Sequence, residues 1–364
     1  MNRPVIIPPH LQFKASLLIL IVTSMQIGVG LLGFQRIIIE VAGNSAWICS
    51  ILAGIVCSLT IYVMLLTLRK YPSYNLYQIH KAIFGKSLGM MINSVYMLYT
   101  SIMPFSILVL YVEVVKTWIF PDIATWIVSA ILMALAVYGL YGGIRSVVGT
   151  LFLSKGLTMW MTLLLIFPMN YADWNYLLPL FDASPFEIFN GLYHMTYTLL
   201  GFELMFFIYP YIADKKNIFK FTNISLLYTT FVYTAVLVVS IVYYSPKQME
   251  TIIWGTISFF TVASFPFMER FEYIGISIWL AYVIPNIMVY LWVCTKGLKE
   301  NFKLKQKKGI VIASILFVIL NSFFESRDLI NIVVDSVAKA SFILVFVYPY
   351  VLYGLSFIRK KEQI

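Results

Sequence analysis

Two ionisable residues lie inside long apolar stretches of the sequence. Lys155 lies within the apolar run 147–168, and Glu203 lies within the run 188–211. A charge at membrane depth is costly, and residues of this kind usually belong to a solute or ion pathway. We therefore expect Lys155 and Glu203 to provide a coupling or structural charge, as a buried titrating pair or in place of a coupling cation. Two structural alternatives stay open: Lys155 extends to the cytoplasmic interface, or Glu203 caps a broken helix.

Glycine and polar residues interrupt two of the apolar runs. Residues 28–33 read Gly-Val-Gly-Leu-Leu-Gly, and Gly201-Phe202-Glu203 follows the polar stretch 193–198. Each glycine lowers helix stability by about 1 kcal/mol relative to alanine. In transporters built from inverted repeats, the first helix of each half is often broken near the midplane, and the freed backbone groups bind solute. The two interruptions therefore predict a solute site, and close helix packing through small residues is the alternative.

The other reactive side chains form no recognisable catalytic or metal-binding pattern. Cys49, Cys57 and Cys294 lie inside apolar runs, without the spacing of a disulfide or a metal site, and the three histidines are scattered. No serine, cysteine or acidic residue belongs to an arrangement typical of an activated nucleophile. We therefore expect no catalytic residue, no metal and no cofactor, and the chain is predicted not to be an enzyme.

The bulk composition indicates a membrane protein. Of 364 residues, 61% are hydrophobic and 12% are charged, whereas soluble domains carry about 25% charged residues. The apolar runs are long enough to cross about 30 Å of hydrocarbon. We predict an all-α polytopic membrane protein with about ten transmembrane helices, in a single transmembrane domain (1–364) with pseudo-repeat halves of about 1–170 and 185–364. The predicted helices span residues 15–35, 43–68, 87–117, 123–141, 147–168, 188–211, 220–244, 271–295, 309–324 and 337–358.

Loop charges set the predicted orientation. Cytoplasmic loops are rich in Lys and Arg, and the two sides of the ten-helix arrangement carry 19 and five such residues. The stretch 251–267 is interpreted as a partly buried outer loop or half-helix, because an eleventh span would move the lysine-rich loop 296–308 outside. Both termini are therefore expected in the cytoplasm. This asymmetry accounts for the net charge of +10 without a nucleic-acid partner, and binding of the 296–308 loop to anionic lipid of the bilayer is an alternative.

Several short motifs resemble those of one family of membrane proteins. They are Gly28-Val29-Gly30-Leu31-Leu32 followed by Arg36, Gly142-Gly143-Ile144, Pro179-Leu180-Phe181, Gly201-Phe202-Glu203 with Tyr209-Pro210, Trp254-Gly255-Thr256-Ile257 and Glu269-Arg270-Phe271-Glu272. The sequence is similar to the amino acid–polyamine–organocation transporter superfamily, and more specifically to the B subunit of endospore germinant receptors, the spore germination permease family. It departs from the family pattern where Leu-Pro-Arg is usual, since it has Phe34-Gln35-Arg36, and where Trp-Pro-Thr is usual, since it has Gly255.

The resemblance implies a five-plus-five inverted repeat with broken helices 1 and 6. It also implies residence in the inner membrane of a bacterial spore, in a complex with an A subunit and a lipoprotein C subunit. The B subunit would sense the germinant, commonly an amino acid such as alanine. Some proton-coupled members of the superfamily carry a lysine on helix 5 where sodium-coupled members bind a second sodium ion, and Lys155 is expected in that role.

We expect a small zwitterionic solute to bind at the membrane midplane. The predicted ligand-binding residues are Gly28, Val29, Gly30, Leu31, Thr100, Leu199, Leu200, Gly201, Tyr282 and Asn286. Backbone amides of residues 28–31 would meet the carboxylate of the solute, and residues 199–201 would frame its apolar side chain. Binding would favour one of two helix arrangements, which the complex would detect.

The leading hypothesis is therefore a germinant-sensing membrane subunit that binds a small solute, with an amino acid as the expected class. The alternative is a secondary active transporter of amino acids, in which the same site alternates between the two faces and Lys155 or Glu203 carries the coupled charge. A third hypothesis is a structural component whose cavity binds nothing. The fold by itself does not separate these functions.

Overall fold

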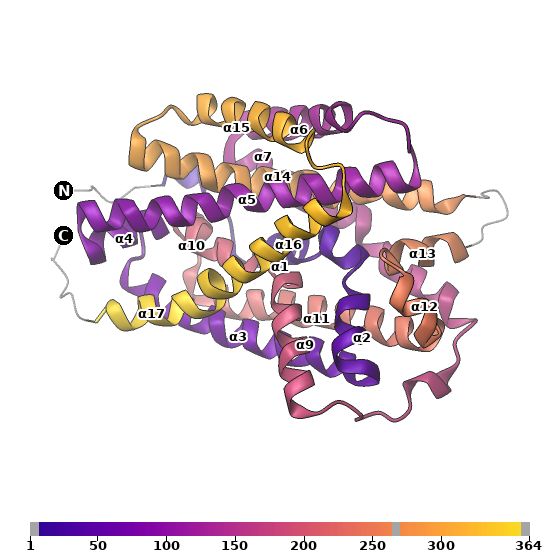
Figure 1. The fold of residues 1–364 in the computed structure, drawn as a ribbon. Helices are drawn as coiled ribbons and strands as arrows, with labels where there is room; N and C mark the ends of the chain where they lie inside the picture. Colours follow the sequence, from indigo (N-terminus) through magenta and orange to yellow (C-terminus); the bar gives the residue numbers. More distant parts are fainter. Residues whose placement is uncertain (1–6, 264–269, 358–364) are drawn as a thin grey trace.

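The computed structural model describes residues 7–263 and 270–357, which are almost entirely helical (Figure 1). An isolated β-bridge joins Phe13 to Ile212, and no β-strand occurs in the described part of the chain. Each of the ten predicted spans corresponds to one helix or to an interrupted series of helices. The prediction of an all-α membrane protein is therefore confirmed.

Six of the predicted spans are continuous helices. They are α3 (Ala46–Lys70), α5 (Lys86–Trp118), α6 (Thr125–Tyr141), α11 (Ile218–Tyr243), α14 (Phe271–Phe302) and α15 (Gln306–Asn321). By length and composition alone, six helical segments of the described chain are able to cross a membrane: Gln35–Lys70, Lys86–Trp118, Gly143–Met169, Lys215–Tyr243, Phe271–Phe302 and Arg327–Leu355. The other predicted spans are not among these six segments, because they are short, as α6 and α15 are, or because they are broken.

The first and sixth predicted spans are broken, as expected. In the first, α1 (Leu18–Gln26) ends before a 3-10 turn, η3 (Val29–Leu32), and α2 (Gln35–Ala42) follows. In the sixth, α9 (Pro185–Thr198) ends before the short elements η7 (Phe202–Leu204) and α10 (Met205–Ile208). Broken helices leave backbone amides and carbonyls without partners inside the helix, so these groups need partners elsewhere or a polar cavity.

Two further spans are continuous in direction but irregular in winding. The fifth consists of α7 (Gly143–Thr158), the 3-10 segment η5 (Met159–Leu165) and α8 (Ile166–Met169). The tenth consists of α16 (Arg327–Ser341), the π-helical segment η10 (Phe342–Val347) and α17 (Tyr348–Leu355). The predicted start of the tenth span, at residue 337, is wrong, since the helix begins at Arg327. Polar residues lower the hydropathy of the first turns of α16, so hydropathy alone did not indicate that the span begins there.

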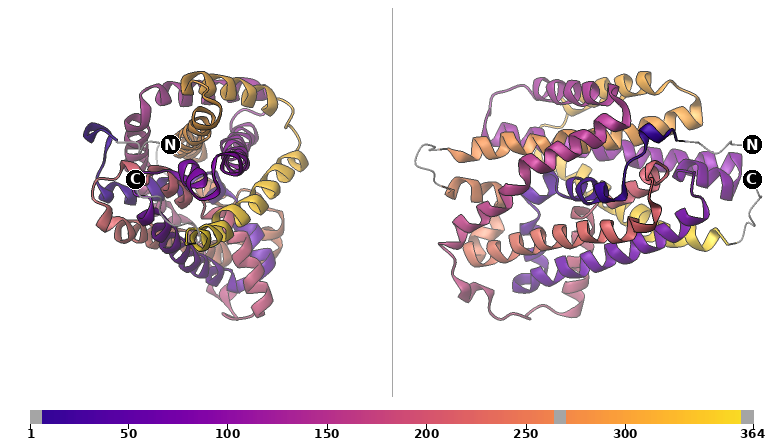
Figure 2. Two further views of the ribbon diagram at one scale, coloured as in Figure 1. Left: turned by 90° about the vertical axis from the view of Figure 1, so that its left-hand side faces the viewer. Right: turned by 180° about the vertical axis from the view of Figure 1, so that it is seen from behind.

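The long helices enclose α1. In Figure 1, α5 and α14 run across the middle of the molecule, α6 and α15 lie above them, and α3 and α11 lie below. Figure 2 shows α1 between these layers, with α16 and α17 on the outside of the bundle. Pro104 and Pro285 lie inside α5 and α14. The first broken helix is therefore positioned on all sides by continuous ones.

The segment between α11 and α14 forms short helices and does not cross the molecule. It contains α12 (Pro246–Thr251), which begins with a capping box at Ser245, and α13 (Gly255–Val262). The Tyr244 hydroxyl donates to the carbonyl of Gly255 at 2.8 Å and holds α13 against the end of α11. An eight-residue helix is too short to span hydrocarbon. The interpretation of 251–267 as a half-helix is confirmed up to Ala263, and residues 264–267 lie outside the described part.

Basic loops that were predicted to share one side of the membrane meet at one end of the molecule. The Lys81 amine donates to the carbonyl of Glu300 at 2.9 Å, and the Lys215 amine donates to that of Pro72 at 2.9 Å. α4 (Leu76–Phe84) and the end of α17 lie at this end, and α12 and α13 lie at the opposite end (Figure 1). Which end faces the cytoplasm stays a prediction from the loop charges.

Candidate functional site

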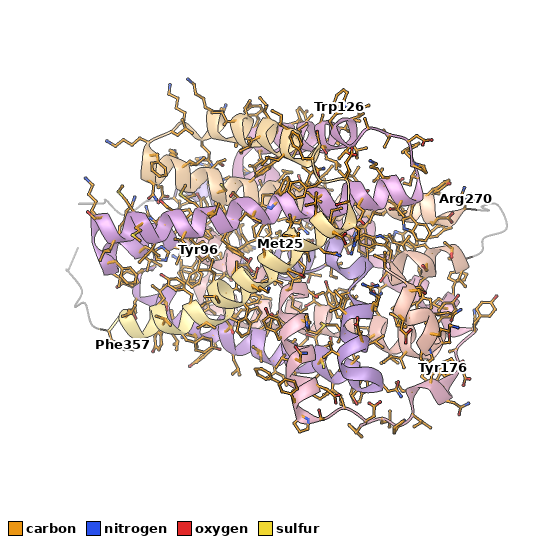
Figure 3. The ribbon with its side chains drawn as sticks, viewed as in Figure 1. Met25, Tyr96, Trp126, Tyr176, Arg270 and Phe357 are labelled. Atoms are coloured by element: carbon orange, nitrogen blue, oxygen red, sulfur yellow. The ribbon has the colours of Figure 1, made fainter. Side chains whose placement is uncertain are left out.

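The two broken helices face each other at the centre of the bundle, where Met25 is labelled in Figure 3. The Gln26 side chain, at the end of α1, donates to the carbonyl of Leu199 at 2.8 Å and accepts from the Thr229 hydroxyl at 2.8 Å. The Tyr233 hydroxyl lies 2.8 Å from the carbonyl oxygen of Gln26 and 3.2 Å from that of Thr198. Side chains of α1 and α11 thus replace the helical partners that both breaks have lost.

Gly201 allows the second break to contact α1 directly. Its φ of +119° lies in a region that other residues rarely adopt. A Cβ atom at this position would lie 2.7 Å from the Cβ of Met25 and 2.9 Å from its backbone carbon. Both the backbone conformation and the available space therefore require glycine at this position.

Glu203 braces the second break. Its side chain is almost completely buried, and one carboxylate oxygen accepts a hydrogen bond from the Gly201 amide at 2.6 Å. The other oxygen accepts from the Tyr290 hydroxyl at 2.7 Å and from the Tyr99 hydroxyl at 3.3 Å. These donors come from the break itself, α14 and α5. The arrangement is that of a helix cap extended across three elements.

Lys155 has different surroundings. It is 4% exposed, its amine donates to the Tyr282 hydroxyl at 3.4 Å, and it lies 4.3 Å from the centre of the Tyr228 ring. No carboxylate lies within 4.0 Å of it in residues 7–263 and 270–357. Cation–π contact and one long hydrogen bond are the only interactions that stabilise the ammonium group in this range. Lys155 and Glu203 are therefore both buried but do not form an ion pair, and Lys155 does not extend to the surface.

A small cavity adjoins the first break. Ile27 and Leu31 line it from the break, Trp279 and Tyr282 from α14, and Thr256 and Phe260 from α13. Its volume of about 30 Å³ is enough for one or two water molecules. Most of the lining is aliphatic or aromatic, with hydroxyl groups interspersed. In this conformation the cavity is much smaller than an amino acid.

Polar groups of α14 reach the backbone of the first break. The indole nitrogen of Trp279 donates to the carbonyl of Gly28 at 3.3 Å. A Cβ atom at Gly28 would lie 2.9 Å from the amide nitrogen of Asn286, so glycine allows this close approach. The buried Oδ1 of Asn286 has no hydrogen-bond partner within the described chain. This face of α14 therefore presents unused hydrogen-bonding capacity beside the break.

The predicted ligand-binding residues divide into two groups in the structure. Leu31 and Tyr282 line the cavity, and Gly28 and Asn286 adjoin it through the contacts above. The others do not line it: Val29, Gly30, Thr100, Leu199, Leu200 and Gly201. Residues 199–201 pack against α1 instead, and Gly30 faces Thr198, whose methyl group lies 3.8 Å from a Cβ built on Gly30. Thr100 donates to the carbonyl of Met97 at 3.1 Å and lies 3.5 Å from the Tyr77 hydroxyl of α4.

Several residues of the site were not predicted from the sequence. The Thr256 hydroxyl, in α13, donates to the carbonyl of Leu31 at 2.6 Å, and the Gln35 amide donates to the Thr256 hydroxyl. These bonds tie α13 to the first break, so α13 covers the cavity from the end opposite the basic loops. The motif Trp254-Gly255-Thr256 was noted in the sequence, but its contact with helix 1 was not. Gln26, Tyr233 and Trp279 carried no sequence signal beyond being polar or aromatic within apolar runs.

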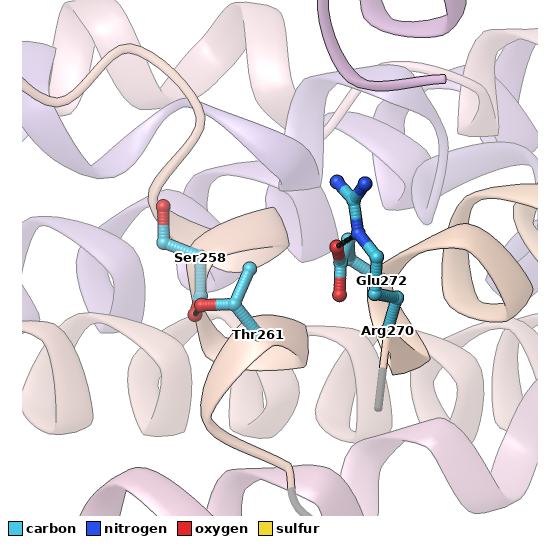
Figure 4. Close-up of polar contacts among 4 residues, drawn as sticks. All are labelled: Ser258, Thr261, Arg270 and Glu272. Carbon is cyan, nitrogen blue, oxygen red and sulfur yellow. Dashed lines mark hydrogen bonds and ion pairs between the residues drawn. The ribbon is translucent and has the colours of Figure 1, made fainter. Parts of the chain in front are cut away.

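Two ion pairs stabilise the same end of the molecule. Arg270 and Glu272, at the start of α14, are 3.0 Å apart, and Figure 4 shows them beside α13. The Glu272 carboxylate raises the pKa of Arg270 above its ordinary value by accepting its hydrogen bond. The second pair joins Arg327 of α16 to Glu113 of α5 at 2.6 Å, and the Arg327 guanidinium lies 5.4 Å from the Trp254 ring. Arg327 thus connects α16 with α5 and with Trp254 at the start of α13, whereas the Arg270–Glu272 pair lies within the start of α14.

No metal centre is formed by the described residues. Within 7–263 and 270–357, no group of three or more His, Cys, Asp or Glu side chains could hold a metal ion. What the site offers is freed backbone at two breaks, an apolar cavity and two amide oxygens, Gln35 Oε1 and Asn286 Oδ1, that have no hydrogen-bond partner within the described chain. These features are suited to binding a small molecule and contain no activated nucleophile.

Comparison with known proteins identifies sequence relatives along nearly the whole chain. Residues 12–330 match the sequence model of the family described as spore germination protein. The chain is 31% identical over 347 residues to spore germination protein GerQB of Bacillus cereus, covering 95% of this chain and 96% of that protein. It is 25% identical over 352 residues to spore germination protein B2 of Bacillus subtilis (strain 168), covering 94% and 95%.

Solved transporter structures share the fold. MHP1, a nucleobase-cation-symport-1 family transporter in a closed conformation, matches 97% of this chain and 84% of its own with a TM-score of 0.68 and 11% identity. MhsT in complex with L-phenylalanine matches 93% and 87% with a TM-score of 0.65 and 12% identity. These likenesses, with the two broken helices, confirm the predicted five-plus-five inverted repeat.

Proposed function

The chain belongs to the spore germination protein family, and from that premise we propose that it is the germinant-sensing membrane subunit of a spore germination receptor. It binds a small solute, an amino acid in our proposal, where the first broken helix meets α13 and α14. Its role is recognition and not catalysis. The role in germination is inferred from the relatives, and the binding of a small solute is inferred from the site.

The observation that carries this proposal is the small cavity beside the first break. The solute carboxylate binds to backbone amides of residues 28–30, which a continuous helix would keep occupied, whereas the Leu31 amide already donates to the carbonyl of Gly28 at 3.2 Å. The apolar side chain of the solute packs against Ile27, Leu31, Phe260 and Trp279. The Asn286 amide oxygen, which lacks a partner in the described chain, accepts a hydrogen bond from the solute ammonium group.

Binding requires the cavity to widen, and this requirement is the basis of the signal. A cavity of about 30 Å³ cannot hold an amino acid, so the solute selects a conformation in which α13 or the first break has moved. A ligand shifts such an equilibrium only by its differential affinity for the two conformations. Because α13 is tied to Leu31 through Thr256, movement of one displaces the other.

The subunit acts in a membrane complex in this proposal. It resides in the spore inner membrane, with both termini and the basic loops on the cytoplasmic side. An A subunit and a lipoprotein C subunit are its partners, and the lipid bilayer surrounds its membrane-spanning helices. The clustering of Lys70, Lys81 and Lys215 at one end of the molecule supports this orientation.

A secondary active transporter of amino acids is the second candidate. The burial of Lys155 without a carboxylate partner in the described chain favours it, because an ammonium held by two aromatic rings can exchange its proton as the helices move. The likeness to symporters shows the fold alone and does not decide between sensor and carrier.

The test is solute binding and uptake by the purified full-length chain. Thermal shift and radioligand binding would be measured across amino acids, sugars and nucleosides, and proteoliposomes would report uptake. Saturable amino-acid binding without uptake is the expected result. Gradient-driven uptake would make the protein a carrier, and saturable binding of sugars or nucleosides alone would refute the amino-acid assignment.

Gly30→Leu serves as the site variant in this test. A Cβ fits at Gly30, since its nearest neighbour is 3.8 Å away, but a leucine side chain would fill the space between the two breaks. We expect at least a tenfold loss of solute affinity with normal accumulation of the protein, while Gly30→Ala binds nearly as the natural chain does. Unchanged binding by Gly30→Leu would show that the space between the two breaks takes no part in binding.

A further inference from the structure

Gln35, Thr256 and Leu31 form a hydrogen-bond chain with a fixed direction at the α13 end of the cavity. The Leu31 carbonyl can only accept, so the Thr256 hydroxyl donates its single proton to it, at 2.6 Å. The fully buried Gln35 side chain therefore donates its NH2 group to the Thr256 oxygen. Thr256, which lines the cavity, has no proton left for a solute and offers it only a lone pair.

The direction of this chain leaves the other atom of the Gln35 amide without a donor. The opposite orientation of the amide would set two acceptors, Oε1 and the Leu31 carbonyl, against the one proton of Thr256. With its NH2 group on Thr256, the amide turns Oε1 away, and this oxygen has no hydrogen-bond partner in the described chain. Gly255 makes room for the amide, since a Cβ atom there would lie 3.3 Å from the Gln35 Cδ.

A second chain with a fixed direction runs along the wall formed by α7 and α14. The Thr158 hydroxyl donates to the carbonyl of Ser154 at 2.7 Å, so it can only accept from any other neighbour. The Tyr282 hydroxyl accepts from the Lys155 amine at 3.4 Å and is also hydrogen-bonded to Thr158. Tyr282 is therefore the donor to Thr158. Like Thr256, these two cavity hydroxyls are left with lone pairs only.

The remaining polar side chains of the cavity are also hydrogen-bonded. The Trp279 indole donates to the carbonyl of Gly28 at 3.3 Å, and Thr162 shares a bond of 3.3 Å with the Tyr228 hydroxyl, in which either group can donate. The other side chains that line the cavity are aliphatic, aromatic or methionine. Around the cavity the backbone thus donates, through the amides of residues 28–30, and the side chains chiefly accept.

Thr256 and Asn286 approach the two ends of one 3-10 turn. Leu31 accepts from Thr256, Gly28 lies next to Asn286, and the Leu31 amide closes the turn by donating to the Gly28 carbonyl at 3.2 Å. α13 packs on η5 and α8, the part of the fifth span beyond Lys155. The α13 end is therefore the favourable end for a second cation, because Lys155 repels one placed beside it.

We propose that the site selects an amino acid with an unsubstituted, primary ammonium group, and that Thr256 is the residue that selects it. One N–H of the ammonium group donates to the Asn286 oxygen, as in the proposed function, and a second donates to the free lone pair of Thr256. Hydrogen bonds from a charged donor are stronger than those between neutral groups, so a quaternary nitrogen is rejected although its charge is the same. This inference rests on the proposed function, in which an amino acid binds beside the first break.

The test is the binding of N-methylated amino acids to the purified full-length chain. L-Alanine and L-leucine are each compared with their N-methyl, N,N-dimethyl and N,N,N-trimethyl forms, which keep the charges but carry successively fewer N–H groups. We expect the first methyl group to change the affinity little, because two N–H groups remain for the two acceptors. The second and third should each lower it at least about tenfold, the effect of losing a hydrogen bond to a charged group.

Thr256→Val separates recognition of the donors from the bulk of the methyl groups. The variant should lose at least about tenfold in affinity for the free amino acid, but less than about threefold for the dimethyl form, whose single N–H still reaches Asn286. Thr256→Ser keeps the hydroxyl and should discriminate as the natural chain does. Thr261→Val is the matched control on α13, because its hydroxyl donates to the carbonyl of Ser258 at 2.8 Å, outside the cavity (Figure 4).

Three outcomes would overturn the proposal and leave the proposed function standing, because an amino acid still binds in each. An equal loss for free and dimethyl forms in Thr256→Val would mean that Thr256 only holds α13 against Leu31. Equal affinity of the natural chain for free and trimethyl forms would show that the charge alone is recognised. Binding that requires sodium chloride in place of tetramethylammonium chloride would assign the Asn286 and Thr256 oxygens to a metal ion, since hard cations take oxygen ligands. Binding of no amino acid at all would refute the proposed function itself.

Discussion

The two breaks of this molecule differ in how completely their polar groups are satisfied. Around the second break, Glu203 accepts three hydrogen bonds and Gly201 packs tightly against Met25. Around the first break there is a cavity, and Asn286 contributes an amide oxygen without a partner in the described chain. Lys155, next to Tyr282 of that cavity, has one long hydrogen bond and an aromatic ring.

This difference separates a structural brace from a responsive site. A network whose members are all satisfied is rigid and costly to disturb. A region with spare hydrogen-bonding capacity and empty space can change partners at little cost when a ligand enters. We therefore expect substitutions near the second break to affect stability and substitutions near the first break to affect binding.

The largest effect on stability is expected from Gly201→Val. A side chain at φ +119° costs about 1–3 kcal/mol, and overlap with Met25 adds about 1–3 kcal/mol. The melting temperature of the purified protein should fall sharply or the chain should fail to accumulate. Gly354→Val is the matched control, since nothing lies within 4 Å of its Cβ position. Equal behaviour of the two variants would contradict the tight packing of the second break.

Glu203→Gln should be the next most damaging. The neutral amide has one acceptor oxygen in place of two, so all three donors lose a charged acceptor, and either the Gly201 amide or the hydroxyls of Tyr99 and Tyr290 face an NH2 group. A hydrogen bond to a charged group is worth about 1.5–3 kcal/mol. Thermal unfolding would measure the loss against Glu113→Gln, whose carboxylate is closer to the surface. If Glu113→Gln proves the more damaging of the two, Glu203 is not a brace.

Lys155→Met, unlike the two substitutions above, should reduce solute binding and not stability. Removing a buried ammonium that has no carboxylate partner in the described chain leaves stability unchanged or raises it. Solute binding or uptake by the isolated subunit should fall at least tenfold, about 1.4 kcal/mol. Lys339→Met, remote from the cavity, should bind solute normally in the same assay. Equal tolerance of both substitutions would exclude Lys155 from the mechanism.

The smallest effect on stability is expected from Asn286→Leu. The side chain has a similar volume, and its Oδ1 makes no hydrogen bond with the described residues, so unfolding should change by about 0–1 kcal/mol. Affinity for an amino acid should nevertheless fall several-fold, because the acceptor for the ammonium group is gone. A large loss of stability with unchanged affinity would make Asn286 part of the brace.

Much of the architecture could be predicted from the sequence, and the site only in part. The ten spans, the half-helix at α13 and the breaks at residues 28–33 and 201 follow from hydropathy, loop charge and glycine content. The predicted site placed Thr100 and Leu199 beside the solute, whereas they do not line the cavity in this conformation. The prediction used depth along each helix, and depth does not specify which face of the helix meets the cavity.

The sequence by itself determined the local features of a membrane protein: which segments are apolar, which loops are basic and where helices are broken. The length of an apolar run, the basic residues of a loop and the glycines that weaken a helix are properties of short segments. Each affects the free energy of the chain in the membrane regardless of which other helices lie beside it. Only the tertiary structure decided which groups meet: that Glu203 binds two tyrosines, that Lys155 does not pair with it, and that α13 closes over Leu31. It also placed the Thr256 hydroxyl between the Gln35 amide and the Leu31 carbonyl. These outcomes depend on helix rotation and packing, which side chains far apart in the chain fix together.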